Sequence, residues 1–304
     1  MINDYFWSIF EFMANIIDEI IKGRKTFFIA PDHSLIPQSF LEEYLTMGYE
    51  CYFIDNDIFL PMETKVELIL NTFKDSILFF NIDFPIQNLK WISLIQTLKL
   101  KHEDALFGVL YTKRQTPSEK ALIEHVYLYT LGLQCGCIQL EYQKKNNFGI
   151  IERTLFANQA MGRRKNVRAV CTSSCSFQFT TEEGEIISGK LNDISISHFS
   201  FTLPEGSIEI AEYEKISDIQ FTIHGLHIRS DAVMYMQRTV ENGQLYVFAF
   251  TTKTGASGLD PLNKQLLTPK LYEIMSQNCN ELLTKLFSAA SHKRGSAIED
   301  LGPL

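Results

Sequence analysis

The sequence predicts a chain of two folded parts, an α/β half followed by an all-β half. Apolar runs of strand length alternate with helix-spaced segments up to residue 157, whereas short strands separated by turn residues dominate after residue 168. The length of 304 residues supports this division, because a single core seldom grows beyond about 250–300 residues. The expected parts are an α/β domain, an arginine-rich linker, a barrel domain and a mobile tail, over residues 1–157, 158–168, 169–290 and 291–304.

Five apolar segments in the first half have the length of buried strands. They are residues 26–30, 49–55, 77–83, 105–112 and 134–142. Helical spacing fills the intervals between them, including a helix capped by Ser118, and a last helix follows over 148–159. Because such alternation produces a parallel sheet covered on both faces, we expect a doubly wound, flavodoxin-like domain. No glycine follows the first strand, which argues against a dinucleotide-binding loop.

The segment before the first strand carries apolar residues at helical spacing over residues 6–20. We expect an amphipathic helix that packs on its own domain or on a second subunit, so a homodimer stays open. Its acidic polar face disfavours binding to a membrane surface. No apolar run approaches the roughly 20 residues that span a bilayer. The six cysteines form no paired CxxC set, so we expect reduced thiols, no metal site and a cytoplasmic protein.

The second half reads as six short strands followed by a helix. The strands are expected over 169–180, 185–195, 198–204, 216–225, 227–239 and 244–252. This spacing is typical of a sandwich or a small barrel, and Asn242–Gly243 predicts a tight hairpin between the last two strands. The apolar face of residues 271–287 is suited to covering one end of a barrel.

A basic cluster separates the two halves of an otherwise acidic chain. The formal net charge is −8, which argues against a general DNA- or RNA-binding protein. Arg163, Arg164, Lys165 and Arg168 nevertheless lie together. A local cluster of this kind can hold a small anionic ligand, because guanidinium groups grip phosphate through paired hydrogen bonds.

The order of an arginine-rich entry, six strands and a C-terminal helix resembles the PilZ domain over residues 160–287. The RxxxR motif of that family is met by Arg164 and Arg168, with Arg163 as an additional arginine. Its (D/N)xSxxG motif is met by Asp193 and Ser195. The resemblance implies a six-stranded β-barrel with a C-terminal helix, and cyclic di-GMP as its ligand.

The last position of the second motif departs from the family. His198 stands where PilZ domains carry glycine. Glycine at a fixed position suggests a positive φ or a close backbone approach, so the histidine ring could either block the pocket or stack on a guanine. The expected ligand contacts are therefore Arg163, Arg164, Arg168, Asp193, Ser195 and His198.

These residue types suit cyclic di-GMP chemically. Arginine can bind the phosphates or the O6/N7 edge of a guanine, or stack on the base. The Asp193 carboxylate can accept hydrogen bonds from the N1–H and N2–H₂ donors of a guanine, and Ser195 adds a hydroxyl group.

The element order of the first half resembles a response-regulator receiver domain. In that family a phospho-accepting Asp follows the third strand, and here Asp83 has that place. Asp32 follows the first strand, Thr112 the fourth, and Lys144 or Lys145 the fifth. Receivers carry a pair of acids after the first strand, whereas this chain has only Asp32. We therefore favour a receiver-like fold without phosphotransfer, with a phosphorylatable Asp83 as the alternative.

The combined features predict a signalling receptor and not an enzyme, because no nucleophile–base set, metal cluster or phosphate loop is present in the sequence. Ligand binding would order the arginine turn and reorient the two domains. The resemblance implies a protein effector, such as motility or adhesion machinery. The alternative is a degenerate PilZ scaffold that acts through protein contacts without ligand.

Overall fold

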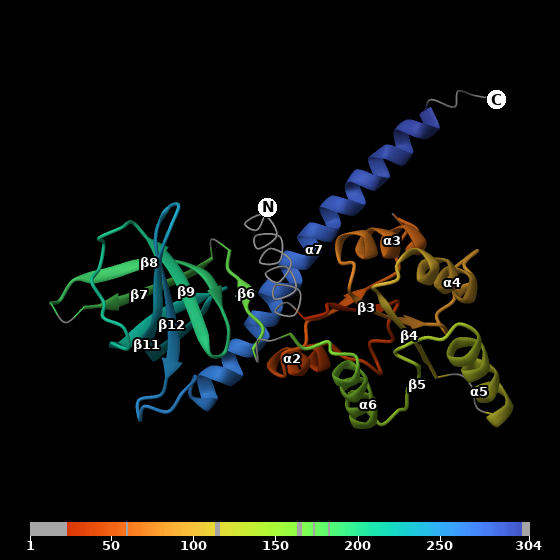
Figure 1. The fold of residues 1–304 in the computed structure, drawn as a ribbon, viewed down its shortest axis with the longest axis horizontal. Helices are drawn as coiled ribbons and strands as arrows, with labels where there is room; N and C mark the ends of the chain where they lie inside the picture. The colour runs from red at the N-terminus through yellow and green to blue at the C-terminus, as the bar shows by residue number, and fades with distance from the viewer. Residues whose placement is uncertain are drawn as a thin grey trace, which may run out of the picture. The chain divides into compact units, whose positions relative to one another are not determined.

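The computed structural model describes residues 23–58, 60–112, 116–162, 166–172, 174–181 and 183–299, with side chains up to residue 291 (Figure 1). The chain divides into two compact units, one of residues 1–165 with 281–304 and one of residues 166–280. The expected amphipathic helix over 6–20 lies outside the described residues, and so do Arg163 and Arg164.

The first unit contains a five-stranded sheet in the order β2-β1-β3-β4-β5. Its strands are β1 Thr26–Ile29, β2 Cys51–Ile54, β3 Ile77–Asn81, β4 Leu106–Tyr111 and β5 Cys137–Gln139. All neighbouring strands pair in parallel. The side chains of β1 and β3 are fully buried, as a sheet covered on both faces requires. The predicted parallel α/β architecture is confirmed.

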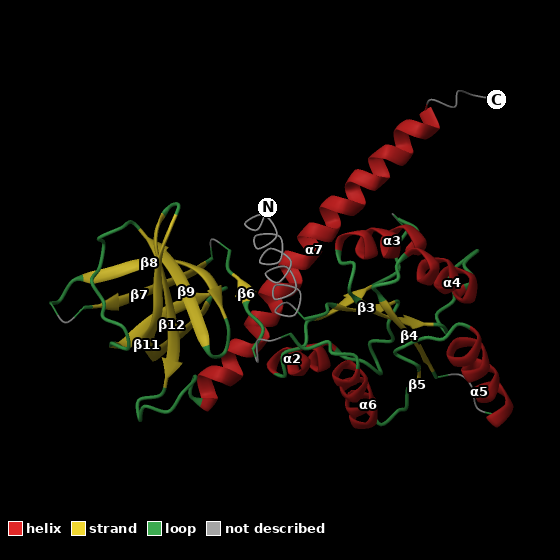
Figure 2. Ribbon diagram, viewed as in Figure 1, coloured by secondary structure: helices red, strands yellow, loops and turns green. Residues whose placement is uncertain are grey.

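Helices cover both faces of this sheet, with α3 and α4 on one side and α2 and α6 on the other (Figure 2). The helices are α2 Gln38–Thr46, α3 Met62–Thr72, α4 Trp91–Lys101, α5 Pro117–Glu124 and α6 Lys144–Ala157, and a π-helical stretch, η1, follows α5 over His125–Thr130. The rings of Tyr44 in α2 and Phe148 in α6 stack at 4.6 Å. The Tyr44 hydroxyl also donates a hydrogen bond of 3.0 Å to the Phe148 carbonyl.

One helix boundary differs from its prediction. Thr116, and not Ser118, caps α5: its side chain accepts a hydrogen bond from the backbone N–H of Glu119, whose carboxylate in turn accepts from the Thr116 backbone. Pro117 occupies the first helical position, where its missing N–H costs nothing. This capping box satisfies two N–H groups that would otherwise lack partners at the helix start.

The second unit is a closed six-stranded antiparallel β-barrel. Its strands are β7 Cys175–Thr180, β8 Ile186–Ile194, β9 His198–Leu203, β10 Lys215–Ile223, β11 Leu226–Val240 and β12 Gly243–Thr251. The order around the barrel is β8-β7-β10-β11-β12-β9, and a β8–β9 pairing closes it. The short strand β6, Ala169–Val170, adds to the edge of β8. The predicted barrel is confirmed, and the segment expected as one strand over 169–180 is two strands.

Aromatic side chains fill the barrel interior. The rings of Phe177 and Phe201 stack at 4.0 Å, and those of Phe199 and Phe248 at 5.2 Å. The predicted hairpin is confirmed between β11 and β12. Its Gly243 has a φ of +130° and lies so close to β9 that a Cβ atom would meet the Leu203 carbonyl oxygen at 2.2 Å, so no other residue fits there.

The C-terminal helix α7 runs over Pro261–Glu299 and is longer than predicted at both ends. Asp260 starts it, because its carboxylate accepts from the backbone N–H groups of Leu262 and Asn263 at 3.1 and 3.0 Å. The start was predicted at residue 271, ten residues too late, and Pro269 lies inside the helix. The helix also continues into the segment expected as a mobile tail. No helix in the described ranges is long and apolar enough to cross a membrane.

Candidate ligand site at the β8–β9 turn

Asp193, the acid of the second motif, lies near the end of β8, where three strands meet. Asp193 pairs with Val170 of β6 on one side and with Ser200 of β9 on the other. The β8–β9 register shifts between Leu191 and Asp193. A bulge of this kind re-aims side chains at the rim of a barrel, and it places Asp193 beside the residue that enters β6.

Arg168 is that entering residue. Its Nη1 atom lies 3.6 Å from Oδ1 of Asp193, and both side chains are 27% exposed. Oδ1 of Asp193 is itself buried and has no hydrogen-bond partner among the described residues. Buried carboxylate oxygens normally accept at least one hydrogen bond. This oxygen is therefore available to a hydrogen-bond donor of a ligand that binds beside Arg168.

Ser195 closes the β8–β9 turn from inside. Its backbone N–H donates to the His198 carbonyl at 2.8 Å, and its Oγ accepts from the His198 N–H at 3.0 Å. The residue is only 1% exposed. The structure thus places Ser195 within the turn, where its hydroxyl serves the backbone, instead of in an open position facing a ligand.

His198 is the first residue of β9 and pairs with Ala249 of β12. It is not among the residues with positive φ, so the argument that this position needs glycine for its backbone conformation is wrong here. An ordinary strand conformation accepts histidine without strain. The imidazole Nδ1 lies 2.8 Å from the Ser197 hydroxyl.

The charges of Arg168 and Asp193 act on the His198 imidazole. Burial lowers the pKa of His198, the positive charge of Arg168 lowers it further, and Asp193 acts in the opposite direction. The imidazole is therefore held in its neutral form at neutral pH. Arg168, Asp193 and His198 form one small polar cluster at the turn.

The pattern of the sequence did not indicate two other residues at this cluster. Asn166 donates from Nδ2 to the Ser197 hydroxyl at 2.9 Å. Tyr235 meets the His198 ring edge-on at 5.7 Å and is 57% exposed. It occupies a bulge where the β11–β12 register shifts between Met234 and Met236. A bulge cannot be located from the alternation of apolar and polar residues alone.

The predicted receiver-type residues are only partly brought together. Oδ2 of Asp83 accepts hydrogen bonds from the Thr112 backbone N–H at 2.6 Å and from its hydroxyl at 3.3 Å. Asp32 instead accepts from the backbone N–H of Ser34 at 2.9 Å, in a local turn. Lys144 and Lys145 lie exposed in the first turn of α6. Within the described residues, no group of three or more His, Cys, Asp or Glu side chains could hold a metal ion.

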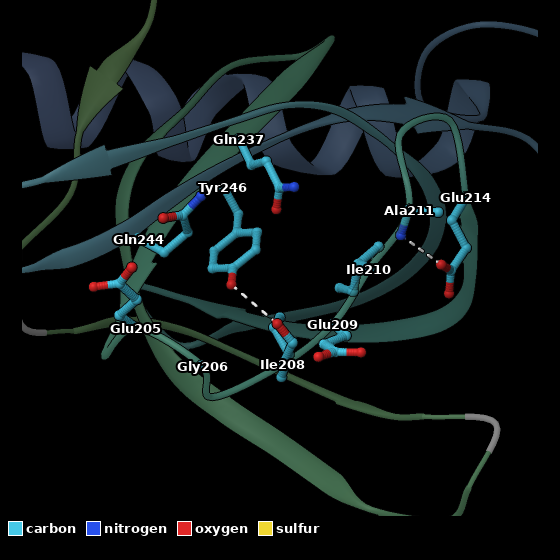
Figure 3. A pocket seen from close by; sticks show the side chains of 10 residues that line it. All are labelled: Glu205, Gly206, Ile208, Glu209, Ile210, Ala211, Glu214, Gln237, Gln244 and Tyr246. Atoms are coloured by element: carbon cyan, nitrogen blue, oxygen red, sulfur yellow. Dashed lines mark hydrogen bonds between the residues drawn. The ribbon is translucent and has the colours of Figure 1, made fainter.

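A separate pocket of about 540 Å³ lies between the β9–β10 connection and the β11–β12 strands (Figure 3). Glu205, Glu209 and Glu214 line it together with Gln244 and Tyr246. None of the motif residues is part of its wall. Its acidic lining would repel a ligand with two phosphates, so the β8–β9 turn remains the candidate site for an anion.

Comparison with known proteins gives remote structural likeness only. No family model matches the sequence, and no curated protein matches it. Among solved structures, the chain is similar to YcgR of Escherichia coli in complex with c-di-GMP, with a TM-score of 0.34 and 16% identity over 41% of this chain and 51% of that one. The inhibitor of motility MotI/DgrA of Bacillus subtilis has a TM-score of 0.31 and 16% identity over 37% of this chain and 51% of that one. The chain thus spans about half the length of these proteins.

An isolated domain is covered almost completely. The PilZ domain of YcgR from Escherichia coli, solved with c-di-GMP, has a TM-score of 0.33 and 16% identity, over 40% of this chain and 97% of that domain.

Proposed function

We propose that this protein is a receptor for cyclic di-GMP that binds its ligand at the β8–β9 turn of the barrel. The observation that carries the proposal is the buried Oδ1 of Asp193, which has no hydrogen-bond partner in the described part of the chain and lies 3.6 Å from the Arg168 guanidinium. An unsatisfied acceptor beside a cation suits the edge of a guanine that lies next to a phosphate. Arg163 and Arg164, which immediately precede the described part of this unit, would complete the grip on the phosphates.

Each residue of the site has a distinct role in this proposal. Asp193 accepts from the N1–H and N2–H₂ groups of one guanine, and Arg168 binds a phosphate or the O6/N7 edge. His198, neutral because of its lowered pKa, contacts the ligand without adding charge. The exposed ring of Tyr235 offers a face on which a base can stack. Ser195 acts indirectly, by holding the turn that carries the others.

For the first unit we propose a receiver-like fold without phosphotransfer. Its strand order, β2-β1-β3-β4-β5, is that of doubly wound flavodoxin-like sheets. The hydrogen bonds from Thr112 to Asp83 resemble the receiver arrangement, but Asp32 is engaged in its own turn. This unit would then present an output surface to a protein effector.

Signal transfer would use the segment between the units. We propose a receiver-like domain over residues 1–157, an arginine-rich linker over 158–168, a barrel domain over 169–290 and a tail over 291–304. Closure of its arginines on the ligand would order the linker and reorient the units. The protein is proposed to be cytoplasmic, without catalytic activity, and to form a homodimer only if the leading segment packs on a second copy. DNA and RNA are not proposed as partners because of the net charge of −8.

A second candidate function is that of a PilZ-type scaffold that works by protein contact alone. Arg168 already has an ion-pair partner in Asp193, and His198 carries a ring at the position where the motif glycine would have no side chain. A ligand would have to displace both. In that case the barrel would keep its fold and bind a protein partner instead.

Calorimetric titration of the full chain with cyclic di-GMP distinguishes the two functions. The receptor predicts micromolar or tighter binding to cyclic di-GMP, and much weaker binding to GMP and to the linear dinucleotide pGpG. If the cyclic ligand produced neither binding heat nor a thermal shift, that result would establish the scaffold function instead.

A further inference from the structure

The His198 ring is held in place by a short chain of polar side chains. Asn166 donates from Nδ2 to the Ser197 hydroxyl oxygen at 2.9 Å, and that oxygen lies 2.8 Å from Nδ1 of His198. The Tyr235 ring packs against the imidazole in a T-shaped arrangement, with 5.7 Å between the ring centroids. A neutral imidazole carries one hydrogen, on Nδ1 or on Nε2, and the hydrogen bond that Nδ1 makes decides which.

The single hydroxyl hydrogen of Ser197 can go to Nδ1 of His198 or to Oγ of Ser195, which lies 3.3 Å away. The Ser195 oxygen is already occupied. It accepts from the backbone N–H groups of Ser197 and His198 at 3.3 and 3.0 Å, and its own hydrogen goes to the His198 carbonyl at 3.1 Å. Because a hydroxyl oxygen has two lone pairs, the Ser197 hydrogen is left for Nδ1. The reverse arrangement would leave that hydrogen without an acceptor among the described residues.

The neutral His198 ring therefore carries its hydrogen on Nε2. Burial and the charge of Arg168 lower the pKa of this histidine, which keeps the ring neutral at neutral pH. Within the described residues Nε2 has no hydrogen-bond partner, and the side chain is half-buried. The ring thus presents one directed N–H donor.

His198 and Asp193 lie on the same face of the β8–β9 ladder. Asp193 pairs with Ser200 of β9. The next residues along, Ile194 and Phe199, pair with each other and are fully buried in the barrel. Because successive residues of a strand point to opposite faces, Asp193 and His198 project from the outer face, as diagonal neighbours about 7–8 Å apart. The barrel wall therefore presents an acceptor and a donor near each other.

We infer that His198 is a specificity-determining residue of the proposed site, and that its Nε2–H donates to O6 of the guanine whose N1–H donates to Asp193. This inference rests on the proposed function. In guanine, O6 is bonded to the carbon next to N1, so one edge of the base meets both side chains. Adenine carries N6–H₂ in the place of O6 and an unprotonated nitrogen in the place of N1–H. Donor would then face donor and acceptor would face acceptor, so the site selects guanine over adenine.

The same contact gives a function to the departure from the family motif. Glycine has no side chain and offers no such donor, whereas the imidazole adds one. Asn166 and Ser197 are positioning residues in this inference, because they contact the ring or its anchor and not the base. They fix the rotation of the ring and the place of its hydrogen.

Calorimetric titration of the full chain with cyclic di-GMP and with cyclic di-AMP tests this selectivity. The natural protein should bind the guanine ligand more tightly. His198→Phe keeps an aromatic ring beside Tyr235 but has no donor, so its binding of cyclic di-GMP should be roughly 2- to 12-fold weaker. Its binding of cyclic di-AMP should not weaken, and the preference should narrow. His227→Phe, in an exposed part of β11, is the matched control and should keep the natural preference.

The outcomes separate this inference from the proposed function. Binding of cyclic di-GMP with an unchanged preference in His198→Phe would overturn the role of His198 and leave the receptor intact. A natural protein that binds both dinucleotides equally would do the same. If neither dinucleotide bound, the receptor and this inference would both be wrong.

A measurement without ligand tests the position of the hydrogen. Nitrogen NMR of the natural full chain, labelled in histidine and recorded at about pH 8 to keep the rings neutral, distinguishes protonated from unprotonated ring nitrogens. Nδ1 of His198 should be unprotonated and Nε2 protonated. A protonated Nδ1 would overturn the inference whatever the affinities are, and this result does not depend on the folding of any variant.

Discussion

Arg168 and Asp193 form an ion pair between the residue that enters β6 and the end of β8, with Nη1 and Oδ1 3.6 Å apart. The register of the two strands fixes it, because Val170 pairs with Asp193. Strand β6 has only two residues, so few backbone hydrogen bonds hold Arg168 in place. A ligand can therefore shift this arginine at a small cost while Asp193 stays fixed in the barrel wall.

Ser195→Ala should destabilise the barrel more than it changes ligand chemistry. The variant loses the hydroxyl that accepts from the His198 N–H and donates to the His198 carbonyl. Leaving a buried donor unpaired costs about 1–3 kcal/mol, which a lower thermal midpoint would report. Ser207→Ala, in an exposed turn, is the matched control and should change stability by less than about 0.5 kcal/mol. Equal midpoints for the two variants would contradict this role.

His198→Gly restores the residue of the family motif and separates the two candidate functions. Since His198 has no positive φ, glycine gains nothing in the backbone and weakens the strand by roughly 0.5–1 kcal/mol. If the ring contacts ligand, affinity for cyclic di-GMP falls, by about 0.5–1.5 kcal/mol for one neutral contact. Tighter binding by the variant would show that the ring blocks the site.

Acid should destabilise the protein through His198. Burial and the charge of Arg168 lower its pKa in the folded state, so the unfolded chain, with a histidine pKa near about 6.5, binds the proton first. Stability is then fully present above that value and is lost as the pH falls toward the folded pKa.

Thermal midpoints measured between about pH 7.5 and about pH 5 should show this loss, and His198→Gln should reduce it. Asp231 and Glu273, whose pKa values are lowered, act at more acidic pH, since unfolded carboxyl groups titrate near about 4. A variant with the same pH profile as the natural protein would rule out His198 as the source.

Asp83 is expected to support the α/β unit and not to carry phosphate. Its carboxylate accepts from the Thr112 N–H at 2.6 Å, so Asp83→Ala should lower stability by about 1–3 kcal/mol. Incubation with acetyl phosphate and Mg²⁺ should leave the mass of the intact protein unchanged. A phosphoryl adduct that disappears in Asp83→Asn would instead establish a working receiver.

The sequence pattern predicted the fold well where long elements carry a clear period. The barrel strands β7 to β12 and the hairpin at Gly243 follow from alternation and turn chemistry. Strand β6 has two residues, too few for any period to show. The start of α7 was predicted at residue 271, whereas the helix begins after Asp260, whose carboxylate accepts from the Leu262 N–H.

The candidate site was predicted less completely, for geometric reasons. Arg168 and Asp193 form an ion pair, and His198 begins the next strand, β9; their role in ligand binding stays a prediction. Ser195 lies inside the turn, because a short polar side chain there satisfies the backbone of its own loop, which motif spacing does not distinguish from a ligand contact. Tyr235 reaches the site only through a bulge in β11, and sequence alternation gives no position for a bulge.

The most direct test of the receptor proposal is the affinity of the full chain for cyclic di-GMP, measured by calorimetry for Arg168→Ala and for Arg238→Ala. Arg238 is an exposed arginine of β11 and serves as the control. It pairs with Leu245 of β12, whereas His198 at the site pairs with Ala249 further along β12, so Arg238 lies away from the site. Loss of a charge-assisted contact of about 1.5–3 kcal/mol predicts binding roughly 10- to 150-fold weaker for Arg168→Ala, with Arg238→Ala close to the natural protein. Unchanged binding in Arg168→Ala, or an equal loss in both variants, would contradict a site at the β8–β9 turn.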